Sequence, residues 1–227
     1  MTIRSGICLS LFILFCAVGI PPASAGEKIL YRINPFGKSE FMDEGVKSVE
    51  GKQLRVSRFR TRVISFDDNE LIYSDPATGL PVRVERNIHW LFNHERIVED
   101  YDQAHFTMVM RKYKGAKITE EHTVTQDGPI YSAILFPFAL RNIADPQIGW
   151  KVKTAFPNEF TITLVSIDDV KVPAGRYKAY HFVSEPKFFE LWISQDQYRI
   201  PVKIQGHGDY CGYTMKLHDY LPRDAAK

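Results

Sequence analysis

The sequence predicts a mainly β protein, an antiparallel meander that forms an open or incomplete barrel with one short helix packed on its concave face. Apolar residues recur at every second position in several segments, which is the period of a half-buried strand. Turn sequences rich in Gly, Pro and Asp separate these segments. Many short strands joined by closely spaced turns favour a meander that closes or nearly closes into a barrel.

The strand pattern is clearest in four segments, and five turns follow from composition. The alternating apolar sets are Ile29, Tyr31 and Ile33; Phe106, Met108 and Met110; Phe189, Leu191 and Ile193; and Ile200, Val202 and Ile204. The turns are expected at residues 75–79, 114–115, 127–129, 173–175 and 206–208. No internal repeat or long linker interrupts the series, so we expect one domain.

The first 25 residues have the pattern of a cleavable signal peptide. Arg4 closes a short positive region, residues 7–20 are apolar, and Ala23 and Ala25 form the A-x-A pattern of a cleavage site. The apolar run is short for a membrane span, which argues against an anchor. We therefore expect cleavage between Ala25 and Gly26, an exported protein, a single β-rich domain over residues 26–227 and no transmembrane span after cleavage.

Cysteine content and charge narrow the class of protein further. Of the three cysteines, only Cys211 follows the expected cleavage site, so no disulfide can form within the mature chain. Cys211 is open to three interpretations: a buried small hydrophobe, a free thiol or a bridge between chains. The formal charge of +2 argues against a dedicated nucleic-acid binder.

Residues 130–141, with the sequence IYSAILFPFALR, depart from the alternating pattern. The run is too continuously apolar for an amphipathic strand, and its length fits a short helix kinked at Pro137. We expect this helix to pack against the concave face of the sheet.

The chain carries no recognisable catalytic or metal-binding motif. It lacks a G-x-S-x-G elbow, and Cys211, with His207 and Asp209 beside it, lies in what we interpret as a loop. The seven histidines are scattered without the spacing of a metal site. The acidic run at residues 67–70 is expected to be a solvated turn. We expect neither an enzyme nor a cofactor.

Three arginines, Arg58, Arg60 and Arg62, lie at period two and share one face of an expected strand. Guanidinium groups bind phosphate bidentately, so this basic stripe could hold lipid phosphates or an acidic partner surface. The alternative is a stripe neutralised by acidic residues on neighbouring strands, such as Glu120.

Large aromatic residues are concentrated in the second half of the chain. If the barrel is incomplete and the helix caps it, they could line a cavity for an acyl chain or another apolar ligand. The alternative is a packed core without a cavity. The candidate lining residues are Phe136, Phe138, Trp150, Phe189 and Trp192.

Three stretches carry a family resemblance: residues 172–180 (VPAGRYKAY), 191–196 (LWISQD) and 199–204 (RIPVKI). They resemble the bacterial domain-of-unknown-function family numbered 3108. The resemblance implies a periplasmic protein and scaffold motifs, with no established activity. Pro173, Gly175 and Pro201 are expected to be structural, because Pro fixes φ and Gly can take a positive φ in a tight turn. The stretch at residues 90–94 (WLFNH) departs from the family pattern and places bulky apolar residues near an expected hairpin end.

The resulting hypothesis is a periplasmic, non-enzymatic binding module for a hydrophobic or amphiphilic envelope component such as a lipid. The alternative is a structural or protein-interaction domain of the cell envelope without a small-molecule site, which would join an envelope protein through an exposed strand edge or an apolar patch.

Overall fold

Fourteen antiparallel strands in one sheet account for most of the described residues. The structure is a computed structural model that describes residues 26–34, 36–155, 159–207 and 212–222. The expected signal peptide and Cys211 lie outside these residues. The sheet order is β8-β7-β6-β5-β4-β3-β2-β1-β14-β13-β12-β11-β10-β9, so β8 and β9 end an open sheet and the predicted fold class is confirmed.

Consecutive strands pair with each other from β1 to β8 and from β9 to β14, and β14 joins these two halves of the meander by pairing with β1. The bounds are β1 Lys28–Asn34, β2 Gly37–Val49, β3 Lys52–Val63, β4 Phe66–Ser74, β5 Pro81–Trp90, β6 Asn93–Asp102, β7 Thr107–Lys114, β8 Lys117–Thr125, β9 Lys151–Ala155, β10 Glu159–Val172, β11 Gly175–Glu185, β12 Phe189–Ser194, β13 Pro201–Gly206 and β14 Tyr213–Leu221, with the helix α1 at Phe136–Leu140.

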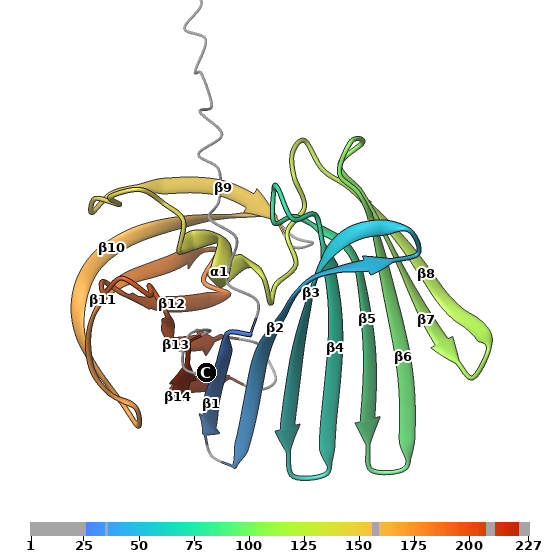
Figure 1. Cartoon of the computed structure of the whole chain (residues 1–227), viewed down its shortest axis with the longest axis horizontal. Coiled ribbons are helices and arrows are strands. Elements are labelled where there is room, and N and C mark those ends of the chain that lie inside the picture. The colour runs from blue at the N-terminus through green and yellow to red at the C-terminus, as the bar shows by residue number, and fades with distance from the viewer. Residues whose placement is uncertain (1–25, 35, 156–158, 208–211, 223–227) are drawn as a thin grey trace, which may run out of the picture.

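The half of the sheet from β9 to β14 curves around α1, whereas β1 to β8 extend away as a flatter layer (Figure 1). The odd-numbered residues Ile29, Tyr31 and Ile33 of β1 are buried against this curved half, as their alternation predicts. In β12 every residue is buried, so this strand is covered on both faces. The core therefore lies between the helix and the inner face of the sheet, over β10 to β14 and the adjoining strands β1 to β3.

The helix is shorter than predicted. It spans only Phe136–Leu140, and Pro137 lies in its first turn, where the missing N–H breaks no helical bond. The expectation of a longer helix kinked at Pro137 is wrong. The amide of Gln103 explains the late start: it donates to the carbonyl of Ile130 at 2.9 Å and accepts from the N–H of Ile130 at 3.2 Å, so the backbone there is satisfied without a helix.

One of the four predicted sets of alternating apolar residues is wrong at its first member. Phe106 has a positive φ of 48° and belongs to the turn before β7, so it does not share a strand with Met108 and Met110. Since β7 lies next to the edge strand β8, this change leaves the core unaltered.

The expected turn at residues 173–175 is present between β10 and β11. Gly175 has φ of +140°, a conformation that side chains with a Cβ rarely adopt. Pro201 begins β13, and its carbonyl accepts a hydrogen bond of 2.9 Å from the hydroxyl of Tyr31. The motif around Gly175 therefore forms the turn between β10 and β11, and the motif around Pro201 begins β13 and fixes it to β1. Among the described residues, no helix is long and apolar enough to cross a membrane.

Candidate functional site

An apolar cavity of about 310 Å³ lies between the α1 region and the inner face of the curved half-sheet. Its volume falls in the range of small-molecule pockets, about 300–1,000 Å³. Most of its walls are aromatic or aliphatic. The lining residues are Tyr31, Phe59, Ala133, Ile134, Phe136, Pro137, Phe138, Phe188, Phe189, Leu191, Ile204, Gly206, His207, Tyr213 and Met215.

Edge-to-face aromatic contacts fix part of the wall. The ring of Phe136 lies 5.6 Å from that of Phe160 and 6.1 Å from that of Phe189, and the last two rings are 5.2 Å apart, all nearly perpendicular. Phe138 stacks on Phe41 of β2 at 4.0 Å, which attaches the helix to the first half of the sheet. Such pairs stabilise by about 0.5–1.5 kcal/mol each beyond their buried area, so they help to hold this part of the wall in place.

Three of the residues that line the cavity, Ala133, Phe188 and Tyr213, are exposed, so the cavity opens to the surface beside them. The ring of Tyr213 lies across Gly206, where an added Cβ would stand 2.3 Å from the ring, so only glycine leaves room for it. His207 stands at this rim, with its Nε2 2.7 Å from Oε1 of Glu190. The mouth therefore combines apolar side chains with the polar side chain of His207.

A buried polar cluster adjoins the cavity on the inner face of β4 and β5. Glu70 lies directly opposite Phe59, a lining residue, and its Oε1 is 3.7 Å from Nε of Arg86. Arg86 also bonds Asp68, whose Oδ1 is buried without a hydrogen-bond partner in the described part of the chain. Burial raises the pKa of Glu70 to about 8, with help from the charges of Asp68 and Glu99 and against the charge of Arg86. The run 67–70 is thus strand, not the solvated turn expected from its charge.

The five aromatic candidates separate into two groups. Phe136, Phe138 and Phe189 line the cavity. Trp150 packs edge-on against Phe182 at 6.1 Å in the core. Trp192 is buried, but its ring contacts His181 and Lys203 on the other face of the sheet. The two tryptophans therefore do not line the cavity, because alternation along a strand sends Trp192 to the face opposite Leu191 and Ile193.

On the outer face, Trp192 belongs to a polar network that the sequence did not reveal. Its Nε1 donates to Oδ2 of Asp168 at 2.9 Å, its ring stacks on His181 at 4.2 Å, and Nζ of Lys203 lies 3.7 Å from its ring centre. Burial alone would raise the pKa of Glu190, but hydrogen bonds from Lys187, His181 and His207 outweigh it and hold the pKa at about 2. The separation of these residues along the chain hid the network, since only strand pairing brings them together.

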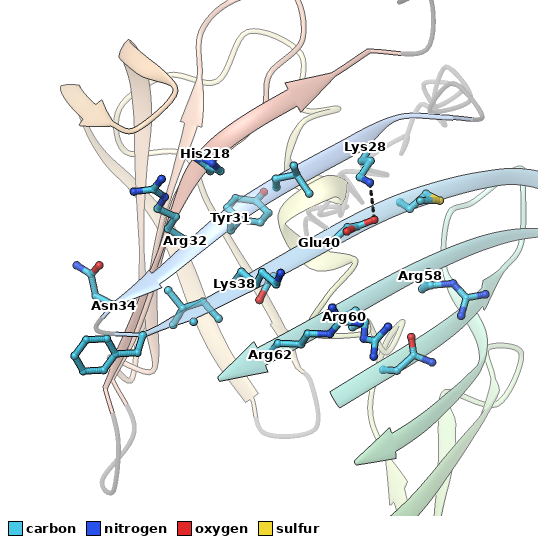
Figure 2. A pocket seen from close by; sticks show the side chains of 17 residues that line it. Lys28, Tyr31, Arg32, Asn34, Lys38, Glu40, Arg58, Arg60, Arg62 and His218 are labelled. Atoms are coloured by element: carbon cyan, nitrogen blue, oxygen red, sulfur yellow. Dashed lines mark ion pairs between the residues drawn. The ribbon is translucent and has the colours of Figure 1, made fainter. Parts of the chain in front are cut away.

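The basic stripe forms part of a hollow of about 710 Å³ on the outer face of β1 to β4 (Figure 2). Figure 2 shows Arg58, Arg60 and Arg62 projecting to the same side of the sheet as Lys38. Lys28 is paired with Glu40 at 2.9 Å. We call this hollow the basic groove; its charged and polar lining residues are Lys28, Arg32, Asn34, Lys38, Ser39, Glu40, Arg58, Arg60, Arg62, Asn69 and His218.

Carboxylates partly neutralise the basic stripe, but Glu120, the residue expected to do so, is not among them. Arg58 pairs with Glu44 at 3.1 Å, while Arg60 and Arg62 share Asp67 at 2.5 and 3.5 Å. Glu120 lies on β8, 3.5 Å from Lys112, five strands from β3 in the sheet order.

Two other cations of the basic groove are available to bind an external anion. Arg32 and Lys38 are exposed and form no ion pair within the described part of the chain. The groove therefore keeps positive charge in excess.

No group of three or more His, Cys, Asp or Glu within the described ranges is arranged to hold a metal ion.

Comparison with known proteins agrees with this fold. The crystal structure of a beta-barrel-like protein of the domain of unknown function DUF1849 from Brucella abortus matches with a TM-score of 0.52 and 10% identity, over 88% of this chain and 98% of that one. At this identity the likeness shows the fold alone. None of the curated proteins matches the chain. The model of a family described as "protein of unknown function (DUF3108)" matches residues 48–218, and the chain belongs to that family.

Proposed function

We propose that this protein is an exported, non-enzymatic binding module that holds the apolar part of an amphiphilic cell-envelope molecule, such as a lipid, in the cavity beside α1. The observation that carries the proposal is the cavity of about 310 Å³ with aromatic walls that reaches the surface at Phe188 and Tyr213. Interiors are normally packed to leave few voids larger than a water molecule, so a space of this size lined by rigid rings favours a ligand.

An amphiphile suits the site better than a wholly apolar ligand. The walls are apolar, but the rim carries His207, with Glu190 and Lys187 in hydrogen-bond contact behind it. A polar headgroup at the rim keeps its hydrogen bonds while the chain is buried, which avoids the cost of an unpaired polar group. The N-terminal apolar segment and the A-x-A pattern support export and a periplasmic location for this activity.

The open edge of the sheet favours a second candidate, a protein-interaction domain. Strand β8 ends the sheet, and all of its residues except Val124 are exposed. Such an edge can accept a strand from another chain. The charged residues Lys117, Glu120 and Glu121 on β8 oppose non-specific pairing, which makes the cavity the stronger basis for function.

The proposal is tested by a substitution that fills the cavity with a larger side chain from one of its lining residues. Ala133 lines the cavity and is exposed, so Ala133→Trp should occlude it with little effect on folding. Ala104 is equally exposed but lies in the turn between β6 and β7, so Ala104→Trp is the matched control. The probe is N-phenyl-1-naphthylamine, whose fluorescence rises in an apolar site, and native mass spectrometry of the purified protein looks for a retained lipid.

We expect the wild type and Ala104→Trp to bind the probe with the same affinity and Ala133→Trp to bind at least about tenfold more weakly. If Ala133→Trp binds the probe as the wild type does, or if the wild type neither binds the probe nor retains a lipid, the cavity is not a ligand site and the β8 edge becomes the next object of study.

A further inference from the structure

Three neighbouring hairpins expose large apolar side chains at one edge of the sheet. The turns of β1–β2, β3–β4 and β5–β6 lie together at the lower edge of the flatter layer in Figure 1. We call them the hairpin tips. At these turns Phe36 is 69% exposed, Ile64 73% and Leu91 69%, and Phe92 is fully exposed.

The second and third tips touch. The N–H of Leu91 donates to the carbonyl of Ser65 at 3.0 Å, and a shallow hollow lies between Val63 and Phe92. Trp90, at the end of β5, is 60% exposed beside them. Single exposed apolar residues are common, but several gathered at one edge mark a contact surface.

A level row of cations lies behind the tips. Arg32, Lys38 and Arg62 are directly opposite one another on β1, β2 and β3, and Lys38 and Arg62 are two residues from the tip residues Phe36 and Ile64. At 3.3 Å per residue this places the row about 7 Å behind the tips. The register extends the row through Lys216 on β14 to Lys203 on β13, so five adjacent strands carry the cations Lys203, Lys216, Arg32, Lys38 and Arg62.

This arrangement matches the two layers of a lipid surface. Apolar side chains of peripheral proteins enter about 5–10 Å into the headgroup and acyl boundary, and basic residues then lie at the level of the phosphates. The aromatic residues Phe36, Trp90 and Phe92 are of the type enriched at membrane interfaces. Binding in an apolar protein groove would require no row of cations, whereas here cations lie at one common depth behind the tips, as a layer of phosphates would require.

We propose that the hairpin tips dock this protein onto an anionic lipid bilayer, with the apolar side chains inserted and the cations of the row, foremost Arg32 and Lys38, on the lipid phosphates; Arg62 is shared with Asp67, and Lys203 lies over the ring of Trp192. The cavity mouth lies near the docked edge: Asn34 at the end of β1 pairs with Thr214, next to the lining residue Tyr213. Docking would place the mouth at the membrane, but it does not depend on the cavity being occupied.

The first measurement is co-sedimentation of the purified protein with vesicles of phosphatidylcholine alone or mixed with phosphatidylglycerol. The mass of the protein is measured first, to show that it has been cleaved before Gly26. Ile64→Ser/Phe92→Ser removes apolar tip residues, and Ile148→Ser/Val165→Ser removes two exposed apolar residues near β9 and β10 as the control. We expect the tip variant to bind mixed vesicles at least about tenfold more weakly and the control variant to bind as the wild type does.

A charge variant tests the row. Arg32→Glu/Lys38→Glu should lose the preference for vesicles with phosphatidylglycerol, since each cation near an anionic surface strengthens binding by about fivefold. Lys151→Glu/Lys153→Glu on β9 makes the same change in net charge elsewhere and should keep most of the preference. Equal losses in the two variants would show attraction by net charge alone and would overturn the proposed orientation.

Trp90 reports insertion directly. Of the three tryptophans, Trp192 is buried and Trp150 half-buried, so Trp90 should shift to shorter emission wavelength on docking and be quenched by lipids brominated on the acyl chain. Ala133→Trp, which occludes the cavity, should still sediment with vesicles, so failure of the cavity proposal and failure of docking are separate results. A wild type that does not bind mixed vesicles, or tip variants that bind unchanged, would overturn the proposal and point to a protein partner for the tips.

Discussion

Glu70 and Arg86 face each other across β4 and β5, with 3.7 Å between Oε1 and Nε, yet the guanidinium is bonded chiefly to Asp68. One cation therefore serves two buried carboxylates. Burial raises the pKa of Glu70 from 4.5 to about 8, so the folded protein keeps this proton at neutral pH while the unfolded chain releases it.

The shift of Glu70 predicts a loss of stability as pH rises. The stabilising effect of the bound proton is complete below about pH 4.5 and is lost between that value and about pH 8, at up to about 1.4 kcal/mol per pH unit. Glu70→Gln removes this dependence and should exceed the wild type in stability at about pH 8. Urea unfolding across this range checks it; parallel curves for the two proteins would contradict the raised pKa.

Glu190 has the opposite dependence. Its pKa is lowered from 4.5 to about 2, so the stabilisation it provides is present above about pH 4.5 and is lost as pH falls toward 2. Glu190→Gln should cost about 1–3 kcal/mol at neutral pH, because His181, His207 and Lys187 lose a charged acceptor. Glu185→Gln, at an exposed position on β11, is the control and should change the melting temperature little. Equal melting temperatures for the two variants would exclude a stabilising role for the network.

The β10–β11 turn depends on glycine. Gly175→Val forces a β-branched residue to φ of +140° and should destabilise the fold by about 1–3 kcal/mol. Gly128→Val is the matched control, since Gly128 has no neighbour within 4 Å of an added Cβ and does not have a positive φ. Thermal unfolding compares the two; a harmless Gly175→Val would show that this turn can relax.

Arg141, at the end of α1, forms an ion pair with Glu27, which directly precedes β1. Its Nη1 and Nη2 donate to the two carboxylate oxygens of buried Glu27 at 2.8 and 2.7 Å, and Nη2 also donates to the carbonyl of Tyr198 at 2.7 Å. Arg141→Ala leaves a buried carboxylate unpaired and should cost about 3–5 kcal/mol. Glu27→Gln/Arg141→Met should recover part of this loss in denaturant unfolding. A double variant no more stable than Arg141→Ala would show that the bond to Tyr198, rather than the ion pair, is decisive.

Local sequence determined the strands and their faces. The alternation at Ile29, Tyr31 and Ile33 predicts a strand with one buried face because side chains on a strand point alternately to its two sides. Gly175 and the motif around it predict the turn, because few residues tolerate its backbone conformation. The spacing of Arg58, Arg60 and Arg62 places them on one face, as observed. These properties depend on neighbours along the chain.

Only the tertiary structure decided which strands lie together. The pairing of β14 with β1 brings Tyr213 beside Asn34, and the pairing of β4 with β5 brings Arg86 to Glu70. The sequence suggested Phe136, Phe138 and Phe189 as cavity residues and a hairpin end near residues 90–94, but the period of a strand carries no information about its partner, so it showed neither the full lining of the cavity nor the grouping of the three hairpin tips. The start of α1 was likewise set by a distant group, the amide of Gln103 bonded to Ile130. Contacts between residues far apart in the chain form only when the sheet curves around its core, and they determine where this protein has room for a ligand.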